Sequence, residues 1–289
     1  MTGRKVEHAM IEGRPSETAQ RVAAHRLGFE RVATDYGNPA ADMALATDVA
    51  GWPQHGMSAG RMHDYLRGRT AFFDRVVVGA LERGFTQVVV GAAGYDGRAL
   101  RYAKPGVTWF EVDLPSTQQD KLARLRRLEL STEHVCFVEA DFASDPVAER
   151  LLAAGLVPSS SCLFLLEGVA VYLERGVLER ALRQFRRAAG PGSRLAISMS
   201  IDGEAHDPEA RARFREAVAA IGEPARLTLE LGEAVELLAS TGWQELAATD
   251  TTDSSVDEDS DDSDEDSDEA AQQRRRSVGF LIAKAAAGP

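Results

Sequence analysis

The sequence predicts an α/β fold in which helices cover both faces of a mostly parallel sheet. From residue 85 onward, apolar runs of strand length alternate with helical patterns, which is typical of parallel strands joined by crossover helices. Two runs, VVV at 88–90 and LFLL at 163–166, are continuously apolar, as in strands buried on both sides. A chain of 289 residues with 44% hydrophobic side chains can bury a core of this kind.

The expected elements follow one another along this core. The expected strands are 85–91, 108–113, 134–140, 161–168 and 193–200. The expected helices are 97–103, 116–130, 146–155, 174–190 and 233–240. Two further strand-like runs, 243–248 and 277–285, have no helical pattern between them. We therefore expect these last two strands to pair as an antiparallel hairpin or to lie as neighbours.

The connection between these two strands carries the charge of the chain. The net charge is −12, and the twelve acids and no bases between residues 250 and 269 account for all of it. A segment with so few apolar side chains cannot bury enough surface to offset the entropy of ordering it, so we expect a disordered acidic insertion at about 250–273. The alternative is that the acids pair with the basic cluster 274–276 or with a basic partner.

The region before residue 85 reads as helices interrupted at Gly37, Pro39 and Pro53. We interpret it as an N-terminal helical cap, 1–84, in front of a core at 85–289. No segment repeats at a fixed period.

Composition excludes several classes of function. No apolar run approaches the roughly 20 residues that span a membrane, and the N-terminal residues lack the apolar core of a signal peptide, so we expect a cytoplasmic protein. Nucleic acid is not expected as a partner, because the longest basic cluster adjoins the twelve acids. The two cysteines, Cys136 and Cys162, lie in apolar runs and are expected to be buried, and no metal-binding motif is present.

The first local signal is the loop after the first core strand, VVVGAAGYDGRAL at 88–100, which by itself is not specific. Its glycines, Gly91, Gly94 and Gly97, are spaced GxxGxxG and not in the GxGxxG pattern of dinucleotide-binding folds. Glycines let the backbone come close to a ligand, and the following helix points N–H groups at a carboxylate or phosphate. The alternative is a plain tight turn between a strand and a helix.

Acidic residues close the next three strands. Asp113 ends the second strand, Asp141 and Phe142 follow the third, and Glu167 follows the fourth. In open α/β sheets ligands bind at this carboxyl edge, and a carboxylate after the second strand can accept both ribose hydroxyls of a nucleoside. Glu111 shares the face of Asp113 by strand alternation. The alternatives are that Asp113 is solvated or caps a helix and that Glu167 caps a turn.

Five ordered motifs together resemble the leucine carboxyl methyltransferase family, which includes actinobacterial O-methyltransferases of natural-product pathways. The motifs are RTAFFD at 69–74, GAAGYDGRALRY at 91–102, FEVDLP at 110–115, ADF at 140–142 and LLEGVAVYL at 165–173. The resemblance covers nearly the whole chain outside the acidic insertion. It implies the class I methyltransferase fold, which is Rossmann-like, with three α/β/α layers and a seven-stranded sheet whose last strand is antiparallel.

The resemblance also implies a cofactor, S-adenosyl-L-methionine, and roles for seven residues. Arg69 is expected to pair with the methionine carboxylate, and Glu167 to lie near the methionyl ammonium and sulfonium. Gly91 and Gly94 are expected to line the amino-acid portion, Asp113 to hold the ribose, and Asp141 and Phe142 to contact the adenine. The usual glycine loop of the family reads GAGxD, whereas this chain has GAAGYD. Ala92 or Ala93 therefore alters the approach of the cofactor.

Methyl transfer from a sulfonium needs mainly alignment of the reacting atoms, so no obligatory catalytic motif is expected. We predict a small-molecule acceptor with a carboxylate, which needs no base, or a phenol, which benefits from one. His55 and His63 are the candidate bases, with an ordinary surface position as the alternative for each. The competing functions are an NAD(P)-dependent oxidoreductase and a non-catalytic binding or regulatory protein on the same fold. The sequence does not predict the oligomeric state.

Overall fold

The computed structural model of this protein describes residues 15–51, 60–202, 216, 219, 224–246, 276 and 279–286. The predicted acidic insertion at 250–273 lies outside the described residues.

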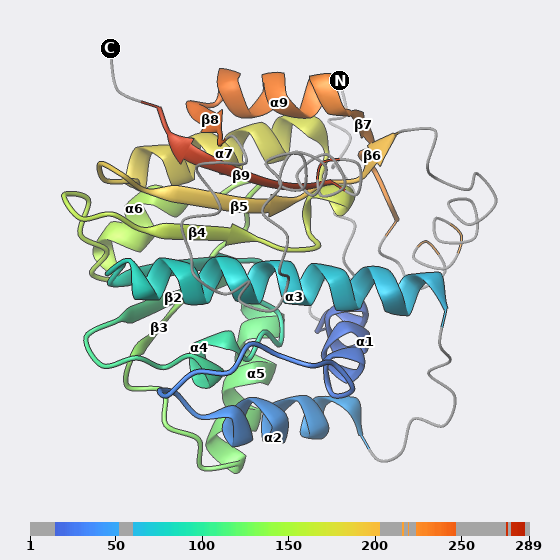
Figure 1. The fold of residues 1–289 in the computed structure, drawn as a ribbon, viewed down its shortest axis with the longest axis vertical. Coiled ribbons are helices and arrows are strands. Elements are labelled where there is room, and N and C mark those ends of the chain that lie inside the picture. Colours follow the sequence, from blue (N-terminus) through green and yellow to red (C-terminus); the bar gives the residue numbers. More distant parts are fainter. Residues whose placement is uncertain are drawn as a thin grey trace, which may run out of the picture.

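A seven-stranded sheet forms the centre of the fold, in the order β3-β2-β1-β4-β5-β9-β8 (Figure 1). The strands are β1 (Gln87–Gly91), β2 (Thr108–Asp113), β3 (Val135–Glu139), β4 (Leu163–Leu166), β5 (Arg194–Ser198), β8 (Trp243–Glu245) and β9 (Phe280–Ala285). The first five strands are parallel, and β9 runs antiparallel to both β5 and β8. The predicted sheet and its final hairpin are confirmed.

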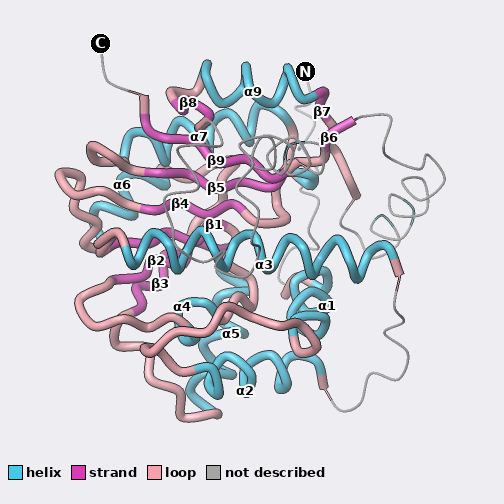
Figure 2. Tube along the Cα trace, viewed as in Figure 1, coloured by secondary structure: helices cyan, strands magenta, loops and turns pink. Residues whose placement is uncertain are grey.

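Helices lie on both faces of this sheet, which gives three layers (Figure 2). They are α1 (Glu17–Arg26), α2 (Pro39–Ala50), α3 (Arg61–Glu82), α4 (Arg98–Arg101), α5 (Pro115–Arg127), α6 (Val147–Ala153), α7 (Arg175–Ala188) and α9 (Leu231–Ser240). A short 3-10 helix, η1 (Ala170–Tyr172), follows β4, and two short strands, β6 (Ile201–Asp202) and β7 (Leu229–Glu230), pair apart from the main sheet.

Two apolar clusters pack against the sheet, one on each face. Side chains of α6, α7 and α9 pack on one face around Phe164 and Trp243. Side chains of α3 and α4 pack on the other face around Phe73 and Trp109. All residues of β1 and β4 are buried, which explains why their sequences are continuously apolar. No helix within the described ranges is long and apolar enough to cross a membrane.

The N-terminal helices reach the sheet in different ways. Although α3 falls in the predicted cap, it packs against β4 and β5 and so belongs to one of the two helical layers. Helices α1 and α2 lie outside that layer and share a third apolar cluster with α5. Ser16 caps α1 by accepting from Ala19 N, and Asn38 caps α2, which begins at Pro39. This arrangement places α1 beside the carboxyl ends of the strands.

Candidate functional site

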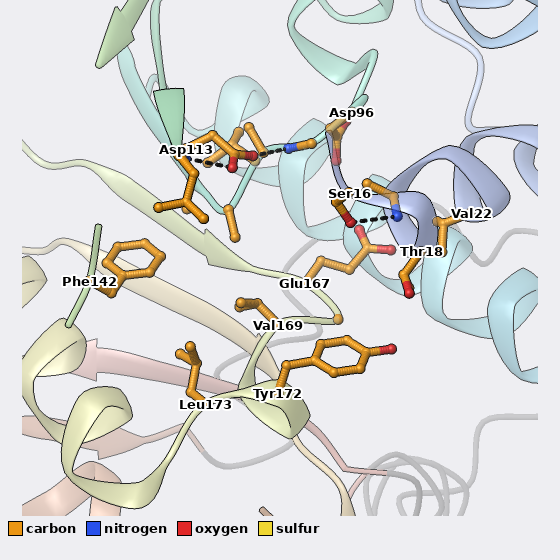
Figure 3. Close-up of a pocket in the computed structure, with 18 of the residues that line it drawn as sticks. Ser16, Thr18, Val22, Asp96, Asp113, Phe142, Glu167, Val169, Tyr172 and Leu173 are labelled. Atoms are coloured by element: carbon orange, nitrogen blue, oxygen red, sulfur yellow. Dashed lines mark hydrogen bonds between the residues drawn. The ribbon is translucent and has the colours of Figure 1, made fainter. Parts of the chain in front are cut away.

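A cavity of about 270 Å³ opens at the carboxyl edge of the sheet. Its walls come from the loops that follow β1, β2, β3 and β4, and from α1, which closes one side. Figure 3 shows Asp113 and Phe142 on one side, Thr18 and Val22 of α1 on the other, and Glu167 between them. This is the edge at which the sequence predicts a ligand.

The structure brings together the seven predicted cofactor-binding residues. All of them line the cavity: Arg69, Gly91, Gly94, Asp113, Asp141, Phe142 and Glu167. Gly91 and Asp113 end β1 and β2, and Arg69 lies in α3. The other four lie in the loops after β1, β3 and β4. The candidate base His63 is not among the described residues that line the cavity, and His55 lies outside the described residues.

His63 packs in an aromatic group beside the cavity. Its ring lies 5.0 Å from the ring of Phe29 and 5.8 Å from that of His25. Burial and then the proximity of His63 lower the pKa of His25, which favours the neutral imidazole. His63 therefore has a packing role in this structure, and its role as a base stays a prediction.

Asp113 ends β2 as a buried carboxylate held by the backbone. Its Oδ2 accepts from Gly94 N at 2.5 Å, and its Oδ1 accepts from Leu114 N at 2.7 Å. Burial raises the pKa of Asp113 above its usual value, although these two N–H groups favour the ionised form. Each carboxylate oxygen keeps a second lone pair with which it can accept from a ligand hydroxyl. Glu111 lies on the same face but pairs with Lys121 at 2.5 Å and does not line the cavity.

Glu167 lies among three guanidinium groups. Its Oε1 forms an ion pair with Arg26 Nη2 at 2.8 Å and accepts from Arg69 Nε at 3.0 Å, and its Oε2 accepts from Arg98 Nη1 at 2.5 Å. Burial alone would raise the pKa of Glu167, but these three arginines outweigh burial and hold it below its usual value. Glu167 is therefore an ionised carboxylate in the floor of the cavity at neutral pH.

The turn after β3 supplies Asp141 and Phe142. Asp141 Oδ1 accepts from Ala143 N at 2.8 Å, which fixes the turn, and Asp141 itself is half-buried at the cavity wall. The ring of Phe142 packs edge-on against Phe185 of α7, with ring centroids 5.8 Å apart. The packing holds Phe142 beside the cavity as an apolar surface.

The glycine loop bends through two left-handed residues, Ala92 (φ 51°) and Gly94 (φ 50°). Ala92 carries a Cβ atom, so this conformation costs it about 1–2 kcal/mol relative to glycine. A Cβ atom on Gly94 would lie 2.9 Å from the Cβ atom of Ala19 in α1. Gly94 thus allows α1 to pack directly on the loop.

Two of the three arginines around Glu167, Arg26 and Arg98, were not predicted as site residues. Arg26 reaches the cavity from α1, and its buried Nε has no hydrogen-bond partner among the described residues. Arg98 and its partner Asp74 lie within two of the family motifs, and the sequence gives no other indication of their position. Arg26 had no such signal, because its place depends on where α1 packs.

These features fit a nucleoside that carries an amino acid. A buried carboxylate lies at the end of β2, an apolar ring lies after β3, and a carboxylate with arginines lies after β4. The unpartnered Nε of Arg26 is a donor that a ligand can satisfy. No group of His, Cys, Asp and Glu that could hold a metal ion occurs among the residues that the structure describes.

Comparisons with known proteins give one family and one fold. The model of the leucine carboxyl methyltransferase family matches residues 18–186. A protein of Parafrankia named as an S-adenosyl-L-methionine-dependent methyltransferase is 40% identical over 146 residues, which cover 49% of this chain and 46% of that protein. This chain thus spans about half the length of that relative.

A second relative and a solved structure extend the match. A Mycolicibacterium smegmatis protein, also named as an S-adenosyl-L-methionine-dependent methyltransferase, is 31% identical over 254 residues, which cover 80% of this chain and 78% of that protein. The crystal structure of a Thermobifida fusca methyltransferase has a TM-score of 0.56 at 18% identity and covers 96% of this chain and 97% of its own. That likeness concerns the fold.

Proposed function

Because this chain belongs to the leucine carboxyl methyltransferase family, we propose that it transfers the methyl group of S-adenosyl-L-methionine to an oxygen atom of a small molecule. The fold is that of class I methyltransferases. The observation that carries the proposal is the cavity itself, in which Asp113, Asp141 and Glu167 lie at three successive strand ends. The names of the relatives in the comparisons agree with this cofactor.

Each end of the cofactor has residues that can hold it. Asp113 accepts from the ribose hydroxyls, while Asp141 and Phe142 contact the adenine. Glu167 attracts the methionyl ammonium, and Arg69 pairs with the carboxylate of the same amino acid. Arg69 donates from its Nε to Glu167 and shares a side-chain hydrogen bond with Tyr65, and its remaining N–H groups can serve that carboxylate.

The bound cofactor supplies an electrophilic methyl group, and the protein supplies alignment. An in-line transfer forms a bond from the acceptor oxygen to the methyl carbon, breaks the bond from carbon to sulfur, and leaves a neutral thioether. With the cofactor bound, Asp113 and Glu167 would hold the donor, and α1, which lines one side of the cavity, would limit the access of water. This step requires no protein nucleophile.

We propose a carboxylate as the acceptor group, with a phenol as the second candidate. None of the described residues that line the cavity is histidine. A carboxylate is ionised at pH 7 and needs no base, whereas a phenol with a pKa near 10 is mostly protonated. The apolar side chains of Val22, Val169 and Leu173 favour an acceptor with a hydrophobic body. A role in secondary metabolism is part of the same proposal.

Two measurements test this function. Isothermal titration should give binding of S-adenosyl-L-methionine and of its demethylated product, and Asp113→Ala should weaken both at least tenfold. Asp64→Asn, in an exposed pair with Arg67, serves as the control and should bind like the wild type. A wild-type protein that ignores both ligands, or an Asp113→Ala variant with unchanged affinity, contradicts the proposal.

The acceptor class is tested by pH. Small carboxylic acids and phenols are offered in turn while formation of the demethylated cofactor is followed. At saturating cofactor, a carboxylate acceptor should react at the same rate between pH 6 and 9, whereas a phenol should react faster as the pH rises. Tight binding of NADH in place of S-adenosyl-L-methionine would favour the oxidoreductase. Cofactor binding without transfer, together with a copurifying macromolecule, would favour a regulatory protein.

A further inference from the structure

The fully buried Arg98 joins three segments that are far apart in the sequence. Its Nε donates to Asp74 Oδ1 of α3 at 2.7 Å, and its Nη1 donates to Asp96 Oδ2 of the glycine loop at 2.5 Å. The same Nη1 donates to Glu167 Oε2 at 2.5 Å, and Nη2 donates to the carbonyl of Thr70 at 3.3 Å. One guanidinium therefore contacts a carboxylate from each of three family motifs.

Arg98 does not line the cavity, although two of its partners do. Asp96 and Glu167 both face the cavity, whereas Arg98 is 0% exposed behind them. Among the described contacts of Glu167, Arg26 and Arg69 bind Oε1, and only Arg98 binds Oε2. Arg98 thus determines the rotation of the Glu167 carboxylate without reaching a ligand.

A chain of buried ion pairs fixes Arg98 in turn. Asp74, which is also 0% exposed, binds Arg31 Nε at 2.5 Å and Arg31 Nη2 at 3.1 Å. Arg31 continues to Asp42 of α2 at 3.1 Å, and Asp42 binds Arg101 of α4 at 2.5 Å. The orientation of Arg98 is therefore set by α2, α3 and α4 together.

We infer that Arg98 is a positioning residue that fixes the rotation of the Glu167 carboxylate for the amino-acid end of the cofactor. The inference rests on the proposed function, which places the methionyl ammonium at Glu167. It goes further because it assigns a role to a residue that touches no ligand.

The charges around Glu167 make this role measurable. The groups that face Glu167 are Arg26 of α1, Arg69 of α3, Arg98 of α4 and the like-charged Asp96. Tyr65, which shares a hydrogen bond with Arg69, and Tyr172 also lie near Arg69. Burial raises the pKa of Glu167, and the loss of one of three arginines leaves burial and Asp96 less opposed. The Glu167 carboxylate then takes up a proton at a higher pH and loses its attraction for an ammonium group.

The experiment compares Arg98→Met and Arg98→Lys with the wild type by isothermal titration of S-adenosyl-L-methionine at pH 6 and pH 8. Folding is checked by circular dichroism. At pH 8 Arg98→Met should bind at least tenfold more weakly than the wild type. The ratio of its Kd at pH 6 to that at pH 8 should exceed the wild-type ratio at least fivefold. Arg98→Lys keeps the positive charge but cannot contact the three carboxylates as a guanidinium does. Its affinity and its Kd ratio should therefore lie between those of the wild type and of Arg98→Met.

Arg124→Met is the matched control. Arg124 also joins two carboxylates, Asp120 at 2.6 Å and Asp48 at 2.8 Å, but neither lines the cavity. The affinity of Arg124→Met for S-adenosyl-L-methionine, and the ratio of its Kd at pH 6 to that at pH 8, should stay within twofold of the wild type. A merely structural role for Arg98 predicts that Arg98→Met and Arg98→Lys lose stability, while the ratio of Kd at pH 6 to Kd at pH 8 stays at the wild-type value.

The outcomes are distinct. A folded Arg98→Met variant with wild-type affinity and pH ratio overturns the inference and leaves the proposed function standing. If Arg98→Met does not fold, Arg98→Lys decides, and a variant within twofold of the wild type at both pH values overturns the inference. Wild-type protein that binds no S-adenosyl-L-methionine at either pH refutes the proposed function instead.

Discussion

Asp74 of α3 and Arg98 of α4 lie 2.7 Å apart, and neither side chain is exposed to solvent. Removal of one partner from a buried ion pair leaves an uncompensated charge and typically costs about 3–5 kcal/mol. We expect Asp74→Asn to lower the free energy of unfolding by that amount at pH 7, as measured by denaturant titration. The arginines hold the pKa of Asp74 below its usual value despite its burial. The stabilisation is therefore present above the unfolded-state pKa, near pH 4, and is lost as the pH falls through the folded-state pKa. The free energies of unfolding of the wild type and of Asp74→Asn should accordingly become similar in acid.

The control for this prediction lies in the same helix. Asp64 pairs with Arg67 at 3.0 Å, but both side chains are about 60% exposed. Asp64→Asn should change the free energy of unfolding by no more than about 1 kcal/mol. Equal effects at the two positions would contradict the assignment of Asp74 to a buried network.

The pKa of Asp113 predicts how cofactor affinity depends on pH. Because burial raises this pKa, Asp113 should take up a proton at a higher pH than an ordinary aspartate, whereas Glu167 stays ionised. We expect the affinity of the wild type for S-adenosyl-L-methionine to fall as the pH drops toward the raised pKa of Asp113. An Asp113→Asn variant should bind weakly and lose this acid limb. Titration calorimetry between pH 4.5 and 8 measures both, and an unchanged acid limb in the variant would show that another group is responsible.

Ala92 and Ala93 should respond in opposite ways to glycine. Ala92 has φ 51°, so glycine removes a strain of about 1–2 kcal/mol, and the greater freedom of the unfolded chain offsets about half of that gain. Ala92→Gly should therefore leave the free energy of unfolding unchanged or raise it by up to about 1 kcal/mol. Ala93 is buried and does not share this conformation, so Ala93→Gly should lower it by roughly 0.5–1 kcal/mol. Thermal unfolding of the two variants tests this prediction, and an Ala92→Gly variant less stable than Ala93→Gly would refute it.

The contact of Gly94 with α1 gives a further prediction. Gly94→Ala places a Cβ atom 2.9 Å from that of Ala19 at a left-handed position, and overpacking of this kind costs roughly 1–3 kcal/mol. Its cofactor affinity should fall as well, because α1 is pushed away from the loop. Gly232→Ala in α9 meets no atom within 4 Å and should be neutral or stabilising. The two variants are compared by thermal unfolding and by titration, and a Gly94→Ala variant with wild-type values would show that α1 has room to move.

Much of the sheet was predictable because its signals are local. Continuous apolar runs predicted β1 and β4, and the missing helical pattern predicted the antiparallel pairing of β8 with β9, which the structure confirms. Asp113 and Glu167 were predictable as cavity residues because each closes an apolar strand, and parallel strands bring their ends together.

The position of α1, which closes one side of the cavity, was not predictable from local patterns. Ser16 at the start of α1 donates from its backbone N to Thr117 Oγ1, a residue 101 positions away, and no local pattern encodes such a contact. The same holds for Arg26, which reaches Glu167 from that helix. His63 is the opposite case. Its imidazole could serve as a base, but its ring packs against Phe29 and does not line the cavity.

The position of β9 bears on how a ribosome can release this protein in folded form. Of the described strands β9 is synthesised last, yet it lies between β5 and β8 and not at an edge. Until Phe280–Ala285 leaves the exit tunnel, β5 presents an unpaired edge of backbone N–H and C=O groups and β8 has no neighbour in the sheet. The nascent chain therefore completes its sheet only after nearly all the described residues have been translated.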